Sequence, residues 1–197
     1  MPITGRKPGD CFGTFRDHLG PVLAATLGSQ HPVICRNDGN RSSLSLGPPS
    51  AVGIRLTSTR GSFIFSLRQN LEVVRTEDGK RWQLKTREYR YAIYDSDDEL
   101  AEARMRWDYV SQVPVGKRWC KHHFQMGRVA GKAVSVPFND GQLDLNRLHT
   151  PTGFVLIEYV LRFLLTDMGV APASPAWESV LDSSQEKFFK QFSGRTS

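Results

Sequence analysis

From Ala51 onward, short strand-like runs follow one another, separated by breaks that contain Gly, Asn or Asp. The runs are VGIRLTST, SFIFSLR, LEVVRTE, RWQLKTREYRYAIYD and EARMRWDYV. An Asp-Gly pair in TEDGKR joins two of them, and this dipeptide is the strongest short-range signal for a β-hairpin. Because consecutive strands with tight connections form antiparallel meanders, this part of the chain is predicted to be a twisted antiparallel sheet. We expect HHFQMGRVAG to add one more strand, followed by a loop through PFNDGQ.

The last third of the chain predicts two helices. The first is expected to have Thr150 as its N-cap and Pro151 in its first turn, to run for about four turns and to end at Gly169. Its polar residues Glu158 and Arg162 lie four apart and can form a pair, whereas apolar residues occupy most of the circumference, as in a helix buried on nearly all sides.

The second helix is predicted to start at Ser174 and Pro175. One of its faces carries Trp177, Val180, Leu181, Ser184, Phe188 and Phe192. We expect the two helices to pack across the sheet, which makes the fold class α+β.

The first fifty residues are predicted to be an extension of this core. Apolar spacing at Phe15, Leu19, Val22, Leu23 and Leu27 indicates a short helix, which Gly20 and Pro21 weaken and kink. The stretch 36–50, RNDGNRSSLSLGPPS, is dense in turn residues and typical of an exposed, mobile linker. The expected division is therefore an N-terminal extension, 1–50, and an α+β core domain, 51–197.

The composition restricts the class of protein. With 197 residues, 39% of them hydrophobic, the chain is long enough for a buried core. No apolar run approaches the roughly 20 residues that a membrane span requires, and MPITGRKPGDCFGTF lacks the apolar stretch of a signal peptide. Three widely spaced cysteines fit a reducing compartment. We therefore expect a cytoplasmic protein with no membrane partner.

The net charge of +6 is concentrated in the middle of the chain, where residues 50–135 carry 16 basic and 10 acidic side chains. Such an excess favours polyanions, RNA or DNA among them, although it is also common in proteins that bind no nucleic acid.

The stretch RWCKHHFQMG, 118–127, holds two adjacent histidines. Alternate side chains of a strand point to opposite faces, so His122 is predicted to lie with the apolar residues and His123 with the polar ones. The same division in RMRWDYV places Arg106 and Asp108 on a polar face. If the two strands are neighbours, five side chains form one exposed polar surface: Arg106, Asp108, Lys121, His123 and Gln125.

This surface has the groups needed to act on a phosphodiester. His123 could accept a proton from a ribose hydroxyl, Asp108 could orient its ring, and Arg106 or Lys121 could stabilise the charge that develops on phosphorus. Four further residues are predicted to contribute to binding: Gln125, Arg104, Arg90 and His149. The alternative is an ordinary half-solvated sheet, in which charged and apolar residues alternate without a function.

A metal site is a further alternative, because Cys120 and His122 share one strand face. Zinc needs three or four converging ligands, and the sequence offers no matching second pair. A nucleophilic role for Cys120 would require a geometry that neighbours on one strand seldom adopt. No phosphate-loop spacing is present either. We therefore predict neither a metal nor a cofactor.

Two stretches carry a family resemblance. HHFQMG and the later LHTPTGFVLIEYVLRFLLTDMGV resemble uncharacterised bacterial proteins with a PHLHVG strand and an LHIPTGRVSLEDVLRFLI helix. Those proteins are in turn similar to the TumE-like toxins of toxin–antitoxin pairs, small α+β proteins with a basic, His-rich segment after an RWD-like strand, which MRWDYV matches. The resemblance covers about residues 85–192. It differs where the related pattern has His-x-His, since this chain has His123-Phe-Gln125 and an amide carries no titratable proton.

The resemblance implies a toxin of a bacterial toxin–antitoxin or defence system, acting as a metal-independent ribonuclease, with a cognate antitoxin or the product of a neighbouring gene as its partner. A non-catalytic module that binds a protein or nucleic acid through the basic sheet is the alternative. A small-molecule enzyme is a third hypothesis for which the chain specifies no substrate.

Overall fold

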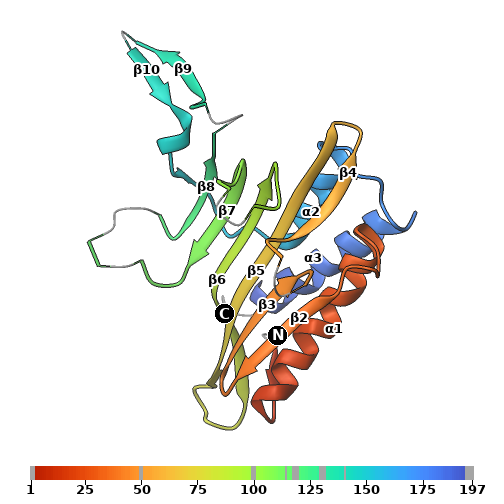
Figure 1. Ribbon diagram of the computed structural model, residues 1–197. Coiled ribbons are helices and arrows are strands. Elements are labelled where there is room, and N and C mark those ends of the chain that lie inside the picture. The colour runs from red at the N-terminus through yellow and green to blue at the C-terminus, as the bar shows by residue number, and fades with distance from the viewer. Residues whose placement is uncertain are drawn as a thin grey trace.

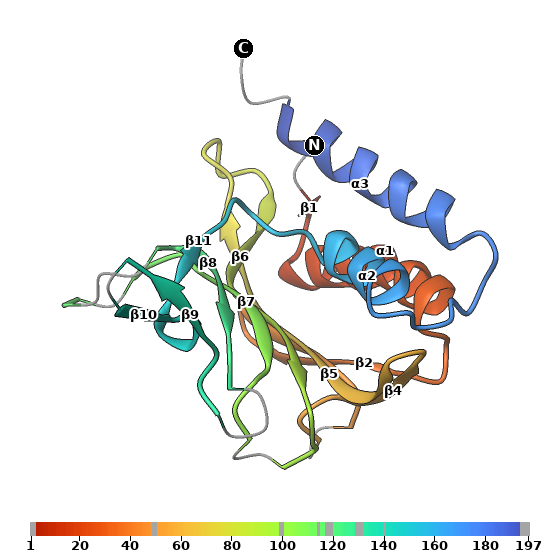
Figure 2. The ribbon, with the colours of Figure 1, turned by 90° about the horizontal axis from the view of Figure 1, so that it is seen from above.

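The computed structural model describes residues 3–48, 51–98, 101–113, 115–116, 120–128, 132–139 and 141–193, without the side chains of Phe138 and 191–193. It confirms the predicted α+β class: a large antiparallel sheet has helices on one face, and its other face is open (Figures 1 and 2).

The sheet is a meander over most of its width. Its central strands are β5 (Gly61–Arg75) and β6 (Trp82–Tyr94), joined by the predicted Asp-Gly turn, in which the Thr76 N–H donates to the Arg81 carbonyl at 2.9 Å. The strand order is β11-β8-β7-β6-β5-β3-β2, with β4 also paired to β5 and β1 to β6. The remaining bounds are β1 (Thr4–Gly5), β2 (Val33–Asp38), β3 (Arg41–Leu46), β4 (Ile54–Ser58), β7 (Met105–Val110), β8 (His122–Met126) and β11 (Thr150–Pro151).

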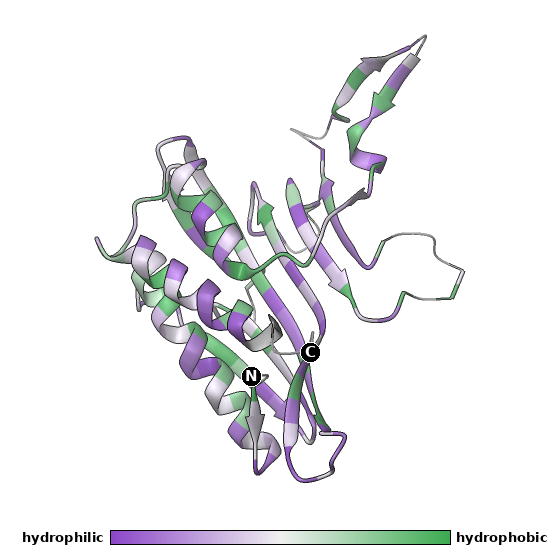
Figure 3. Ribbon diagram, turned by 180° about the vertical axis from the view of Figure 1, so that it is seen from behind, coloured by the Kyte–Doolittle hydropathy of each residue, from purple (hydrophilic) through white to green (hydrophobic). Residues whose placement is uncertain are grey.

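The three helices α1 (Pro8–Thr26), α2 (Ile157–Thr166) and α3 (Trp177–Ser193) cover the same face of the sheet (Figure 2). The core lies between them and the strands, with Phe65 and Leu161 both 0% exposed. Helix α2 is the most hydrophobic of the three in Figure 3. On α3, Leu181 and Ser184 of the predicted face are buried, whereas the Phe192 side chain lies outside the described part of the chain.

The predicted separation of residues 1–50 from the core is wrong. Helix α1 begins at Pro8, where the Asp10 carboxylate accepts the N–H groups of Arg6 and Lys7, and its Leu19 and Val22 belong to the main core. Residues 36–46 form most of the β2–β3 hairpin instead of a linker. The turn residues 39–40 close this hairpin, and alternation in RSSLSL directs Leu44 and Leu46 into the core.

The start predicted for the first C-terminal helix is also wrong. Thr150 pairs with Phe124 and Pro151 with His123 as the short edge strand β11, a position at which proline is tolerated, and α2 begins only at Ile157. The expected Glu158–Arg162 pair is replaced by contacts to α3: Ser184 Oγ donates to Glu158, and Arg162 lies 2.5 Å from Asp182.

The loop predicted through PFNDGQ is a second hairpin, formed by β9 (Ser135–Phe138) and β10 (Gly141–Asp144), which projects from the body of the molecule (Figure 1). A single turn of 3-10 helix, Leu145–Arg147, follows it. Asn146 fixes this junction because its side-chain oxygen accepts the Val134 N–H at 2.6 Å.

Gly127 provides a test of the packing between strands. A Cβ at this position would lie 1.7 Å from the Ala103 carbonyl oxygen, a backbone atom that cannot rotate away. Gly127→Ala is therefore expected to lower the free energy of unfolding by about 1–3 kcal/mol or more, as overpacking does. Chemical denaturation of both forms measures this difference.

Gly13→Ala is the matched control for Gly127→Ala, because nothing lies within 4 Å of its added Cβ in the middle of α1. It should raise stability by roughly 0.5–1 kcal/mol through helix propensity. Equal effects of the two substitutions would contradict the packing described for Gly127.

Candidate functional site

Four polar side chains lie in one row across the open face of the sheet. The strand register pairs Arg68 with Arg90, Arg90 with Asp108, and Asp108 with His123, on β5, β6, β7 and β8. Because directly opposed residues point to the same face, the row places residues 55 positions apart in sequence beside one another. The RWD strand and the HHFQM strand are thus neighbours, which is the condition on which one shared polar surface depends.

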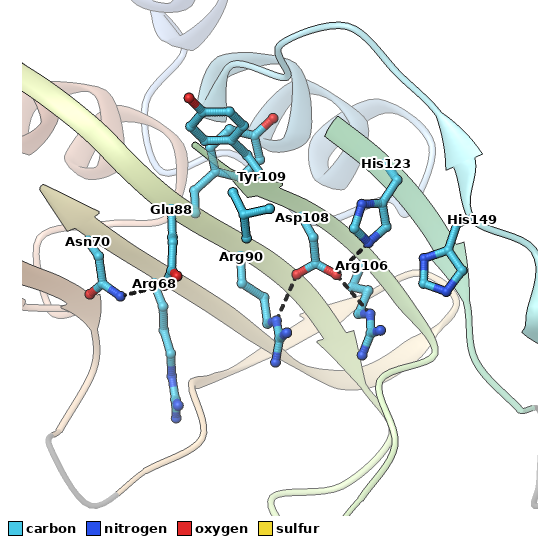
Figure 4. A pocket seen from close by; sticks show the side chains of 11 residues that line it. Arg68, Asn70, Glu88, Arg90, Arg106, Asp108, Tyr109, His123 and His149 are labelled. Atoms are coloured by element: carbon cyan, nitrogen blue, oxygen red, sulfur yellow. Dashed lines mark hydrogen bonds and ion pairs between the residues drawn. The ribbon is translucent and has the colours of Figure 1, made fainter. Parts of the chain in front are cut away.

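This row forms part of a cleft with a volume of about 320 Å³ (Figure 4). Most of its lining residues have polar or charged side chains, and they come from β5, β6, β7, β8 and the segment before β11. The lining residues are Arg68, Asn70, Glu88, Tyr89, Arg90, Arg106, Asp108, Tyr109, Val110, His123 and His149.

Asp108 is the centre of the charge network in the cleft, and it is 6% exposed. Its Oδ1 lies 2.8 Å from Arg90 Nε, and its Oδ2 lies 2.9 Å from Arg106 Nε and 3.5 Å from His123 Nε2. One carboxylate thus faces two guanidinium groups, so the positive charge of the arginines exceeds the negative charge that compensates it. Arg90 and Arg106 remain 51% and 29% exposed and can also contact a bound anion.

His123 lies on the predicted polar face, but it is 5% exposed and not part of an open surface. Its Nδ1 is 3.0 Å from the Cys120 carbonyl, which can only accept a hydrogen bond, so Nδ1 carries a proton. Nε2 therefore faces the Asp108 carboxylate. A carboxylate that activates a histidine base would accept the hydrogen bond of Nδ1. In His123 the Cys120 carbonyl takes that place, and Asp108 lies on the other side of the ring.

His149 is brought beside His123 by the β11–β8 pairing, with 4.8 Å between ring centroids. Burial lowers the pKa of His149, and the charges of His123 and Arg106 lower it further, against the opposing effect of Asp108. The ring is consequently held in its neutral form near pH 7, the form that can accept a proton.

The other predicted residues have different surroundings. Gln125 accepts a hydrogen bond from Arg106 Nη2 and donates to the Asn146 carbonyl at 2.9 Å, so it fixes Arg106 and the hairpin junction. Arg104 pairs with Asp95 at 2.7 Å, outside the lining of the cleft, and Lys121 is exposed and also outside it. The sequence did not predict Arg68, although alternation in SFIFSLR would have placed it on the polar face.

His122 lies on the other face of β8, as predicted, where its ring stacks on Tyr109 at 4.4 Å. The stacking on Tyr109 keeps His122 on the opposite side of the sheet from Asp108 and His123. In the part of the chain that the structure describes, no three His, Cys, Asp or Glu side chains gather closely enough to hold a metal ion. Among the described residues, no helix is long and apolar enough to cross a membrane.

Comparison of the chain with protein-family models, with curated proteins and with solved structures finds no match. The site must therefore be interpreted from its own geometry and charge.

Histidines with lowered pKa values make the stability of the fold dependent on pH. Burial lowers the pKa of His122, with a further contribution from the charges of Lys121 and His123, and the pKa of His149 is lowered too. A depressed pKa favours the neutral form in the folded state, so stability is highest above about pH 6.5 and falls as the pH drops through the folded-state pKa.

Thermal unfolding should therefore occur at a lower temperature at pH 5.5 than at pH 7.5. His122→Asn should reduce this dependence, because it removes one of the histidines whose pKa is lowered. An unfolding temperature that rises on acidification over this range would contradict the assignment.

Proposed function

We propose that the cleft binds RNA and cleaves its backbone without a metal ion, with His149 as the general base. The observation that carries the proposal is that His149, whose pKa is lowered, lines one cleft together with Arg68, Arg90 and Arg106. Arginine side chains recognise phosphate through charge-assisted hydrogen bonds, and a neutral imidazole is the side chain best suited to remove a proton near pH 7.

In the proposed reaction the phosphorus is transferred from the 5′-oxygen to the 2′-oxygen of the adjacent ribose. His149 takes the proton of the ribose 2′-hydroxyl, the 2′-oxygen attacks the adjacent phosphorus, and the bond to the 5′-oxygen breaks. The products are a 2′,3′-cyclic phosphate and a 5′-hydroxyl, whose proton comes from water. Arg68 and Arg90 bind the RNA backbone, and Arg106, whose charge acts on His149, contributes positive charge at the reacting phosphate as it becomes more negative.

The direct test uses purified protein, a labelled RNA oligonucleotide and an excess of chelator. We expect cleavage with a cyclic phosphate end, and no cleavage of DNA of the same sequence, since DNA lacks the attacking hydroxyl. Intact RNA at every protein concentration, or equal cleavage of the DNA, would contradict the proposal.

Binding without cleavage is the second candidate, and one observation favours it. His123 Nε2 faces Asp108, and Gln125 stands where the pattern that this chain resembles has a second histidine, so His149 is the base that we assign. If the protein only binds, the affinity for RNA should still fall steeply with salt.

Arg68→Gln tests the phosphate contact under both candidates. It should weaken RNA binding and reduce the slope of log affinity against log salt by about 1, as expected for one lost phosphate contact. Arg16→Gln, which removes an exposed arginine of α1 on the helical side, is the control. Equal losses from both substitutions would point to general charge attraction and not to this cleft.

From the resemblance to TumE-like toxins we also propose the system in which the protein acts. The RNA would be cytoplasmic, and the protein would act in a bacterial toxin–antitoxin or defence system in which a cognate partner blocks the cleft. Growth arrest on expression of the wild type, relieved by His149→Ala, is the expected result.

A further inference from the structure

A second cleft, with a volume of about 430 Å³, adjoins the first and shares three arginines with it. The shared residues are Arg68, Arg90 and Arg106, so the same guanidinium groups face both cavities. The lining of the second cleft is completed by Val52, Tyr94, Ala101, Glu102 and Ala103.

Strand β6 connects the two clefts. Tyr94 follows Arg90 by four residues, so both side chains point to the open face, about 13 Å apart along the strand. Ala92 lies between them on that face and is 0% exposed. The Ala92 side chain itself adds little bulk between Arg90 and Tyr94, and Arg106 lies directly opposite it on β7.

The wall of the second cleft is anchored to the sheet. The Arg104 N–H donates to the Ile93 carbonyl at 2.7 Å, and the Gly127 N–H donates to the Arg104 carbonyl at 2.8 Å. Ala103, just before this anchor, is buried. The cavity beside Tyr94 is therefore held by backbone hydrogen bonds to two strands.

The charges in the second cleft favour an anion. Three arginines face one acidic residue of its lining, Glu102, whose carboxylate is 3.9 Å from Arg128. Tyr94 is the aromatic residue among the described residues that line this cavity. Guanidinium groups next to an aromatic ring are the combination by which proteins hold single-stranded nucleic acid, through phosphate contacts and base stacking.

We infer that the second cleft receives the base of the nucleotide next to the phosphate held by Arg68 and Arg90, and that Tyr94 stacks on this base. This inference rests on the proposed function and narrows its substrate to single-stranded RNA. A base in a duplex is already stacked and paired, so its face is not available to a tyrosine ring.

The test measures the affinity of a labelled single-stranded RNA for wild type, Tyr94→Ala and Tyr94→Phe. Tyr94→Ala should raise the Kd roughly 5- to 150-fold, the range of one lost base–aromatic stack. Tyr94→Phe should stay close to the wild type, because it keeps the ring. Tyr159→Ala, which removes a tyrosine of α2 that is 45% exposed, is the control and should leave the Kd unchanged.

A second arm uses oligonucleotides that lack single bases. At the position that stacks on Tyr94, removal of the base should abolish the difference between wild type and Tyr94→Ala. Equal Kd values for wild type and Tyr94→Ala on intact RNA overturn the inference, as does a tyrosine effect that persists at every abasic position.

The outcomes separate the two proposals. Binding that depends on Tyr94 without any RNA cleavage supports the second cleft and overturns the catalytic proposal. If Tyr94→Ala changes neither the KM nor the kcat of RNA cleavage, only the inference about the second cleft is overturned. Failure of the wild type to bind RNA overturns both.

Discussion

His149→Ala is expected to lower the rate constant for RNA cleavage by about 10²- to 10⁴-fold, the usual contribution of a general base. The neutral ring of His149 is the proton acceptor that the cleft presents, because Nε2 of His123 faces a carboxylate. Single-turnover cleavage with saturating protein measures the chemical step without the binding step. RNA affinity should change little, since the substitution removes no positive charge at pH 7.

The pH profile provides a signature that a structural role of His149 would not produce. Because its pKa is lowered, the rate should be nearly constant above about pH 6.5 and should fall only at lower pH, where the ring becomes protonated. His31→Ala is the matched control: burial lowers its pKa as well, but it lies between α1 and β2, outside the lining of the cleft. A comparable loss of rate in both variants would contradict the assignment.

Asp108→Asn is expected to lower the free energy of unfolding by about 2–4 kcal/mol, because breaking a buried charge pair leaves its cations without compensation. The substitution keeps the shape of the side chain but places a neutral amide among Arg90, Arg106 and His123. A loss near 4 kcal/mol corresponds to charges that solvent screens only weakly. The exposure of Arg90 reduces the effect from what a fully buried pair would give.

Asp97→Asn is the control for Asp108→Asn. Asp97 also lies 3.0 Å from an arginine, Arg55, but its side chain is 75% exposed. Its loss should change stability by no more than about 1 kcal/mol, as for other surface ion pairs. Urea denaturation compares the two variants, and equal effects would show that the burial of Asp108 has no energetic consequence.

The alternation of side chains along the strands was predictable because it depends only on local geometry. The split of His122 and His123 between two faces follows from a period of two residues, and the Asp-Gly hairpin before Trp82 follows from the turn preference of that dipeptide. Strand alternation therefore predicts which residues share the polar face of the candidate site.

The boundaries that failed depend on contacts between distant segments. The Ser, Asn and Gly residues of 36–50 predict a linker, but pairing with β5 makes β3, within this stretch, a strand of the main sheet. Thr150 was interpreted as a helix N-cap, but β8 recruits it as an edge strand. In both cases hydrogen bonds to a distant strand determine the conformation, against the local propensity.

The composition of the site was only partly predictable. Five residues of the predicted set line the cleft: His123, Arg106, Asp108, Arg90 and His149, the last from a segment more than twenty residues downstream of His123. Lys121 and Arg104 lie outside the lining of the cleft: Lys121 is exposed just before β8, and Arg104 pairs with the Asp95 carboxylate. Whether the residues of the cleft act as proposed stays a prediction.

The sequence by itself determined the α+β class, the polar face of the sheet and the residue types that the site contains, since these follow from short-range periodicity. Only the tertiary structure decided which of these residues meet. Strand register aligned Arg68, Arg90, Asp108 and His123 in one row, and buried His123 against the Cys120 carbonyl. Burial, charge pairing and pKa depend on distances between segments far apart in the chain, and those distances are fixed only when the strands pair.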